Sequence, residues 1–211
     1  MTDFDKRARD WDSDPDKVQR ARAVADAIRK AIPLTSEMKA LEYGCGTGLL
    51  SFALQPELGR ITLADTSQGM LDVLIEKIAS AGVTNMHPVR LDLAYDSLPT
   101  EQYDLTYSLM TLHHIHDVND MLVKFRDLLV PKGYLLVADL DQEDGSFHTD
   151  GTIDVHLGFD RNELQKMLES SGFGNVSFST AYKIKKRIGN EEKIFPVFLM
   201  SAQKAYHSSH T

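Results

Sequence analysis

Ala40-Leu41-Glu42-Tyr43-Gly44-Cys45-Gly46-Thr47-Gly48-Leu49-Leu50 is the stretch that decides the fold, because apolar residues flank a glycine-rich turn on both sides. The three glycines stand at every second position. Their missing Cβ atoms permit a sharp turn and let a ligand lie against backbone amides. This pattern is typical of the first strand, loop and helix of an open α/β sheet, where nucleotide-like ligands bind.

Two departures from known phosphate-binding loops narrow the kind of ligand. The dinucleotide fingerprint Gly-x-Gly-x-x-Gly would place its third glycine where this chain has Leu49. The Gly-Lys-Ser/Thr ending of a P-loop is also missing after Gly48. The loop therefore predicts a nucleoside ligand without a pyrophosphate, and it argues against a nicotinamide-dependent oxidoreductase.

Acidic residues follow the next predicted strands. The strand expected over residues 60–65 ends in Asp65, about twenty residues after the glycine turn, where such folds hydrogen-bond the hydroxyls of a ribose. A third strand is expected over residues 85–91, and Asp92 follows it. A fourth is expected over residues 103–109. The sheet thus gathers polar groups at the carboxyl ends of its strands.

These motifs, in this order, resemble those of the class I S-adenosylmethionine-dependent methyltransferases. The matching positions are Glu42 to Gly48, Asp65 in Ala-Asp-Thr-Ser, Asp92 in Arg-Leu-Asp-Leu, Tyr103 to Ser108 with Leu112 to Ile115, and Leu129 to Tyr134. The resemblance implies a single-domain, Rossmann-like α/β fold: a doubly wound, mostly parallel sheet with a final antiparallel strand and helices on both faces. It also implies a helical lid over residues 1–34, a methyltransferase domain over 35–205 and a tail over 206–211.

The resemblance further implies how S-adenosylmethionine would be held. Asp65 would bind the ribose, Asp92 the adenine amino group, and the backbone at Leu93 a ring nitrogen. The predicted cofactor-binding residues are Trp11, Glu42, Tyr43, Gly44, Cys45, Gly46, Asp65, Thr66, Met70, Asp92, Leu93, Ser108 and His113. For Trp11 two interpretations stay open, since it could face the pocket from a lid or pack the N-terminal helix onto the sheet.

Several histidines are candidates for metal binding or for proton transfer. His113, His114 and His116 invite a metal interpretation, but they lack helical i, i+4 spacing and cysteine partners, so no metal site is predicted. The resembling family often carries a Leu-His-His-Ile run as a wall of the cofactor cleft. The candidate catalytic residues are His148 and His156, because imidazole can take a proton near neutral pH.

The carboxylates between residues 139 and 144 are candidates for a base or a divalent-ion site, with a solvated acidic loop as the favoured alternative. The predicted function is transfer of a methyl group from S-adenosylmethionine to a nucleophilic atom of a small molecule. The alternative is a noncatalytic sensor or scaffold that binds the cofactor. The methylated atom and the oligomeric state stay open.

Composition limits the setting and the partners. The chain has 211 residues, enough for one domain, and no apolar run approaches the roughly 18 residues that span a membrane. One cysteine cannot form an internal disulfide, and the N-terminus shows no signal-peptide pattern, so a cytoplasmic location is expected. A net charge of −8 disfavours nucleic acid as a partner. The basic cluster Lys183, Lys185, Lys186 and Arg187 is interpreted as a solvated rim.

Overall fold

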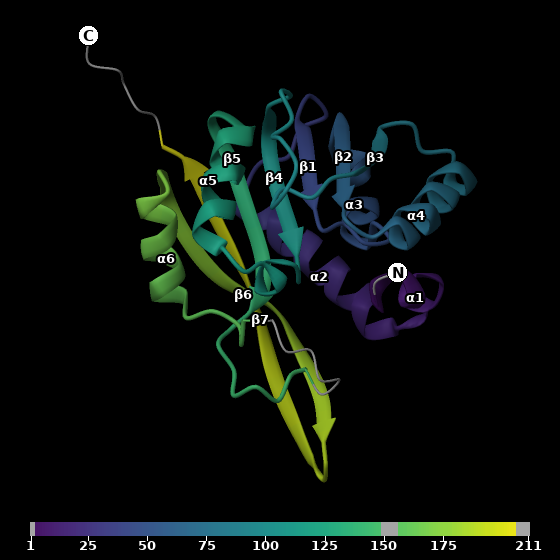
Figure 1. Cartoon of the computed structure of the whole chain (residues 1–211), viewed down its shortest axis with the longest axis vertical. Coiled ribbons are helices and arrows are strands. Elements are labelled where there is room, and N and C mark those ends of the chain that lie inside the picture. The colour runs from purple at the N-terminus through teal and green to yellow at the C-terminus, as the bar shows by residue number, and fades with distance from the viewer. Residues whose placement is uncertain (1–2, 149–155, 206–211) are drawn as a thin grey trace.

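The computed structural model describes residues 3–148 and 156–205, so the predicted tail over 206–211 lies outside the described residues (Figure 1). The strands are β1 (Lys39–Tyr43), β2 (Arg60–Asp65), β3 (Met86–Arg90), β4 (Tyr103–Leu109), β5 (Leu129–Leu140), β6 (Phe173–Ile188) and β7 (Glu191–Lys204). The α-helices are α1 (Asp3–Arg7), α2 (Pro15–Ala31), α3 (Leu49–Leu54), α4 (Gln68–Ala81), α5 (Val118–Leu128) and α6 (Arg161–Ser170). Short 3-10 helices are η1 (Ala8–Ser13), η2 (Gln55–Glu57) and η3 (Leu112–His114).

One sheet carries all seven of these strands, in the order β3-β2-β1-β4-β5-β7-β6. The pairs from β3 through β5 are parallel, and β7 runs antiparallel to both β5 and β6. The order turns outward from β1 in both directions, which is the doubly wound arrangement. The predicted fold class, with its final antiparallel strand, is confirmed.

Helices cover both faces of the sheet and enclose two apolar cores. On one face, α2, α3 and α4 bury residues such as Val24, Leu50 and Leu74. On the other face, α5 and α6 bury residues such as Leu122 and Leu164. Among the described residues no helix is both long and apolar enough to cross a membrane.

Local capping sets the limits of two helices. The Ser67 hydroxyl accepts a hydrogen bond from the Met70 amide at 3.2 Å and so caps α4, which Gly82 ends with a φ of 64°. Asp160 caps α6 by accepting from the backbone amides of Asn162 and Glu163. These side chains act on their own neighbours, so sequence alone could identify them.

Strand pairing lengthens the strands at the C-terminal side of the sheet. β5 starts at Leu129, which pairs with Tyr103 before an irregularity in the ladder. The ladder between β6 and β7 continues to the pair Ile188 and Glu191 at the hairpin tip. Pairing between strands, which local patterns do not encode, extends each one.

The β6–β7 hairpin extends past the arrowhead end of β4 (Figure 1), and β6 forms one edge of the sheet. Lys183, Lys185 and Arg187 are exposed at alternate positions along β6. Lys186 differs from them, because its ammonium donates to the Phe147 carbonyl oxygen at 2.8 Å. Three members of the basic cluster therefore fit the solvated-rim interpretation, and the fourth holds the segment that follows β5.

Candidate functional site

The glycine loop, residues 44–48, joins β1 to α3 in a conformation that side chains would obstruct. Gly44 has a φ of 71° and Gly48 a φ of 78°, both in the left-handed region. A Cβ on Gly44 would lie 2.3 Å from the Thr111 side chain, and one on Gly48 would lie 2.6 Å from Leu74 Cδ1. These two glycines let the loop pack tightly on the fold.

Gly46, in contrast, has room for a Cβ at ordinary van der Waals distance from its neighbours. The nearest heavy atoms to a Cβ built there are Met70 Sδ and Trp11 Nε1, each 3.9 Å away. The structure therefore brings three of the predicted cofactor-binding residues together, with Gly46 between the other two. A flat ligand could approach the loop backbone at this point.

The N-terminal segment is tied to the glycine loop and to α4. Asp12 accepts hydrogen bonds from the Thr47 hydroxyl and from the Lys77 ammonium, which also donates to the Thr47 carbonyl oxygen at 2.6 Å. Asp5 accepts from the Ser67 hydroxyl at 2.6 Å. These contacts place residues 3–13 where a lid over the loop would lie.

Asp65 ends β2 with both carboxylate oxygens held by backbone amides. Gly46 N–H donates to Oδ2 at 2.7 Å, and Ser67 N–H donates to Oδ1 at 2.8 Å. Burial raises the pKa of this carboxyl, while the two amides oppose the rise. Each carboxylate oxygen can accept a further hydrogen bond, so a pair of adjacent hydroxyls fits the chemistry of Asp65.

A pocket of about 370 Å³ opens beyond β2 and β3. Its lining residues are Thr66, Arg90, Asp92, Tyr95 and Asp96. Two of them, Thr66 and Asp92, are among the predicted cofactor-binding residues. Asp92 Oδ1 accepts from the Ala94 amide at 2.9 Å, so a turn fixes its position.

Leu93 is less accessible than its predicted role requires. Its amide donates to the Tyr43 hydroxyl at 3.1 Å, and its side chain is fully buried. Burial raises the pKa of Tyr43 to about 12, so the hydroxyl stays protonated. A ring nitrogen could bind the Leu93 amide only by replacing this hydrogen bond, and the predicted contact stays a prediction.

Three other predicted residues are buried. Glu42 is 2% exposed and accepts a hydrogen bond from the Ser51 hydroxyl, and burial raises the pKa of Glu42 to about 8. Burial also raises the pKa of the Cys45 thiol well above its usual value. The Ser108 hydroxyl is buried and makes no hydrogen bond within the described residues. The side chains of Glu42 and Cys45 thus point into the fold and not toward a ligand on the surface.

His113 is held by a buried carboxylate at the end of β5. Its Nδ1 lies 2.6 Å from Asp139 Oδ1, its backbone amide donates to Asp139 Oδ2 at 3.2 Å, and both side chains are at most 1% exposed. An ionised carboxylate only accepts, so Nδ1 carries a proton, and in the neutral imidazole Nε2 is then the nitrogen with the lone pair. Nε2 is buried and has no hydrogen-bond partner in the described part of the chain.

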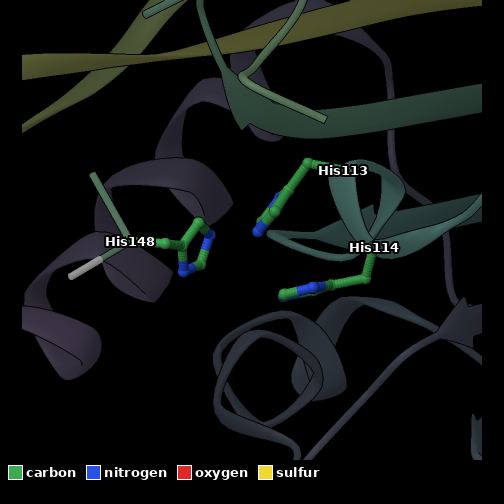
Figure 2. Close-up of side chains that lie close together, drawn as sticks. All are labelled: His113, His114 and His148. Carbon is green, nitrogen blue, oxygen red and sulfur yellow. The ribbon is translucent and has the colours of Figure 1, made fainter. Parts of the chain in front are cut away.

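Figure 2 shows three imidazole rings around one space: His113, His114 and His148, here named the histidine cluster. One ligand atom from each ring lies within 4.8 Å of the others. The Phe4 ring packs edge-on against two other rings: its centroid lies 5.6 Å from the centroid of His114 and 6.0 Å from the centroid of Trp11. The N-terminal segment therefore touches both the glycine loop and the histidine cluster.

Sequence reasoning singled out these histidines one by one but missed the cluster. His148 follows β5, far along the chain from η3, and no spacing rule connects the two segments. The structure separates the two predicted catalytic histidines. His156 donates from Nε2 to the Ile115 carbonyl oxygen at 2.9 Å and lines a second pocket with His116.

The carboxylates after β5 hold their own segment. Asp141 pairs with Arg161 at 2.6 Å, and Glu143 accepts from the Phe147 amide at 2.9 Å. Hydrogen bonds from Lys193 and Ser146 lower the pKa of Asp144 to about 2. These contacts position the chain just before His148.

Known proteins share both the sequence pattern and the architecture. A family model described as a methyltransferase domain matches residues 40–133. An uncharacterised methyltransferase of Schizosaccharomyces pombe is 32% identical over 170 residues, which make up 74% of this chain and 58% of that relative. The chain thus spans little more than half the length of this curated relative.

Two solved structures share the fold at low identity. One is a putative methyltransferase of Haloferax volcanii in complex with the Trm112 methyltransferase activator, which has a TM-score of 0.75 at 15% identity. The superposition covers 98% of this chain and 99% of the Haloferax chain. Phosphoethanolamine N-methyltransferase 2 of Haemonchus contortus, in complex with S-adenosyl-L-methionine, has a TM-score of 0.70 at 15% identity. This superposition covers 86% of this chain and 52% of the Haemonchus chain.

Proposed function

This chain belongs to the class I S-adenosylmethionine-dependent methyltransferase family, and we propose that it binds S-adenosylmethionine over the glycine loop and transfers the methyl group to a small molecule. One observation carries the proposal. Gly46 lies between Met70 and Trp11 without a side chain of its own, and its amide fixes Asp65. A loop backbone and a ribose-binding carboxylate are thereby held as one unit.

The polar groups around the loop match the parts of the cofactor. The ribose hydroxyls would bind Asp65, and the adenine would lie toward the pocket at Thr66 and Asp92. The methionine part would lie along Gly44 and Gly46. The sulfonium would then point toward the end of β4, where η3 carries the histidine cluster.

Methyl transfer needs alignment more than it needs a strong catalytic group. The methyl carbon sits on a positive sulfur, so a nucleophile held about 3 Å away can displace the sulfur directly. A proton acceptor is needed only when the nucleophile arrives protonated. His148 lies at the proposed reacting end, while His156 stays a prediction beside the second pocket.

A small substrate fits the surface and the cleft better than a polyanion does. The net charge of −8 opposes binding of nucleic acid phosphates. The N-terminal segment also covers the loop, which leaves limited room beside Trp11. The proposal therefore favours a neutral or cationic metabolite.

Calorimetric titration tests the cofactor assignment. Wild-type protein should bind S-adenosylmethionine and S-adenosylhomocysteine with micromolar affinity and should not bind NAD. Asp65→Ala should weaken both interactions by about 100-fold, because a buried pair of charge-assisted hydrogen bonds is worth about 3 kcal/mol. Asp72→Ala, which changes an exposed carboxylate on α4, is the matched control and should bind as wild type does.

Equal affinity in the Asp65→Ala and wild-type proteins would refute this site, as would tight binding of NAD. Binding of S-adenosylmethionine without turnover on any nucleophile would instead favour the sensor or scaffold alternative. Circular dichroism of both variants checks that any loss of affinity is local.

A further inference from the structure

We propose that the histidine cluster binds a divalent transition-metal ion, with His113, His114 and His148 as its three ligands and Zn²⁺ as the best-fitting ion. Metal binding at this position does not depend on methyl transfer. It also revises the expectation from sequence, which considered the histidines of η3 without His148.

Geometry is the first support. The three candidate nitrogen atoms lie within 4.8 Å of one another, and the rings surround one space (Figure 2). Zn–N bonds of about 2.0 Å in a tetrahedral site would bring the nitrogens to roughly 3.3 Å from one another. His114 and His148 are both partly exposed, so side-chain rotation can supply the contraction of roughly 1.5 Å.

The buried His113 is the second and independent support. Asp139 fixes the proton on Nδ1, so the lone pair of Nε2 is directed away from the carboxylate. This Nε2 is buried without a hydrogen-bond partner among the described residues, which is costly for a polar atom. Carboxylate–histidine–metal triads share this arrangement, in which the carboxylate sets the tautomer and makes the imidazole a better ligand.

Charge around the cluster is compatible with a cation. Asp139 places a buried negative charge next to His113, which partly compensates a divalent ion. Arg20 interacts with the same carboxylate, but its guanidinium is also paired with Asp16 at 3.4 Å. Lys186 donates to the Phe147 carbonyl oxygen beside His148, and this contact fixes the ammonium on the backbone.

Three neutral imidazoles and an open fourth position are the ligand set of catalytic zinc sites. The fourth position would take water or a heteroatom of the substrate, and the ion would lower the pKa of a bound thiol or hydroxyl. This consequence rests on the proposed function. If both hold, the methyl acceptor is a thiol or a hydroxyl compound whose proton leaves to solvent when the metal binds it.

Cobalt titration tests the site without cofactor or substrate. Tag-free, chelator-stripped protein should bind one Co²⁺ per chain and develop the visible absorption bands of a tetrahedral nitrogen site, and Zn²⁺ should displace the Co²⁺. His148→Ala and His114→Ala should each weaken binding at least 100-fold. His116→Ala is the matched control, because His116 lies on the same turn but outside the cluster, and it should leave binding unchanged.

Second variants keep the test decisive. Asp139→Asn should weaken Co²⁺ binding 10- to 100-fold, as is typical of residues that orient a metal ligand. Replacement of His207 and His210 by alanine should leave the affinity for Co²⁺ unchanged. Absence of tetrahedral bands in the wild type, or equal affinity in the His148→Ala and wild-type proteins, would overturn the proposal. S-adenosylmethionine binding is measured separately, so failure of the metal site leaves the cofactor assignment standing.

Discussion

The two sides of the cleft are built differently. On one side, the glycine loop is held by its own backbone: the amides of Gly44 and Cys45 donate to the Ala64 carbonyl oxygen, and the Gly46 amide anchors Asp65. On the other side, side chains from β5, η3 and the segment after β5 converge on the histidine cluster. A site made of backbone depends on local sequence, whereas a site made of side chains depends on the fold that gathers them.

The largest expected effect lies on the loop side. Gly44→Ala adds a Cβ that would lie 2.3 Å from the Thr111 side chain, at a φ of 71°. Left-handed strain and overpacking together should lower the free energy of unfolding by about 4 kcal/mol. Urea denaturation measures the change.

Gly82→Ala is the control for Gly44→Ala, because its φ of 64° is similar and nothing lies within 4 Å of the added Cβ. It should cost only about 1 kcal/mol, which is the left-handed strain alone. Equal losses in the two variants would show that strain, not packing of the loop, dominates at Gly44.

The second effect concerns a buried side chain on the loop side of the cleft, Glu42. Burial raises the pKa of Glu42 from 4.5 to about 8, so between these values the folded state binds a proton that the unfolded state lacks. Stability should therefore fall as pH rises, by about 1.4 kcal/mol per pH unit, or roughly 3 kcal/mol between pH 5 and pH 7.

The measurement compares urea denaturation of the wild type and Glu42→Gln from pH 5 to pH 9. Since glutamine does not titrate, the difference between the two proteins isolates the contribution of Glu42. A constant difference across this range would mean that Glu42 is ionised in the fold and that its position beneath the loop costs little.

The third effect concerns the histidine side. Asp139→Ala removes the acceptor for His113 Nδ1, for the His113 amide and for the Leu140 amide, all in a buried setting. Unsatisfied donors should lower the free energy of unfolding by about 2 kcal/mol. Thermal and urea denaturation give the value, and Glu37→Ala, which changes an exposed carboxylate before β1, should leave the denaturation curve unchanged.

The smallest effect concerns the cover that both sides share. Trp11→Ala removes the indole beside Gly46 and should weaken binding of S-adenosylmethionine about tenfold, or about 1.4 kcal/mol. Trp11→Phe should recover part of the affinity, because an aromatic ring remains. Unchanged affinity in Trp11→Ala would mean that the indole only packs the segment onto α4.

The contrast between the two sides also explains what could be predicted from sequence. The glycine loop, Asp65 and the caps Ser67 and Asp160 act within a few residues or at a fixed spacing, so their roles follow local rules. The pairing of His113 with Asp139 and the position of His148 depend on strand order and on the path after β5. Nothing in the spacing of those residues encodes their meeting.

Glu42 shows a second limit. A carboxylate in the strand before the loop is part of the resemblance, but its burial beside Ser51 and Tyr107 comes from the packing of α3 on the sheet. Sequence placed this residue near the cofactor, whereas its side chain lies below the loop. A strand residue next to a site can face either side of the sheet, and only packing shows which.

The exposed edge at β6 has a consequence for how the protein behaves at high concentration. An unpaired strand edge can pair with another chain and seed aggregation, and positive charges along the edge oppose such pairing. Lys183, Lys185 and Arg187 occupy alternate exposed positions on this edge. The basic cluster thus acts as protection against self-association, and exchanging its charges for valine or threonine would create an aggregation-prone strand.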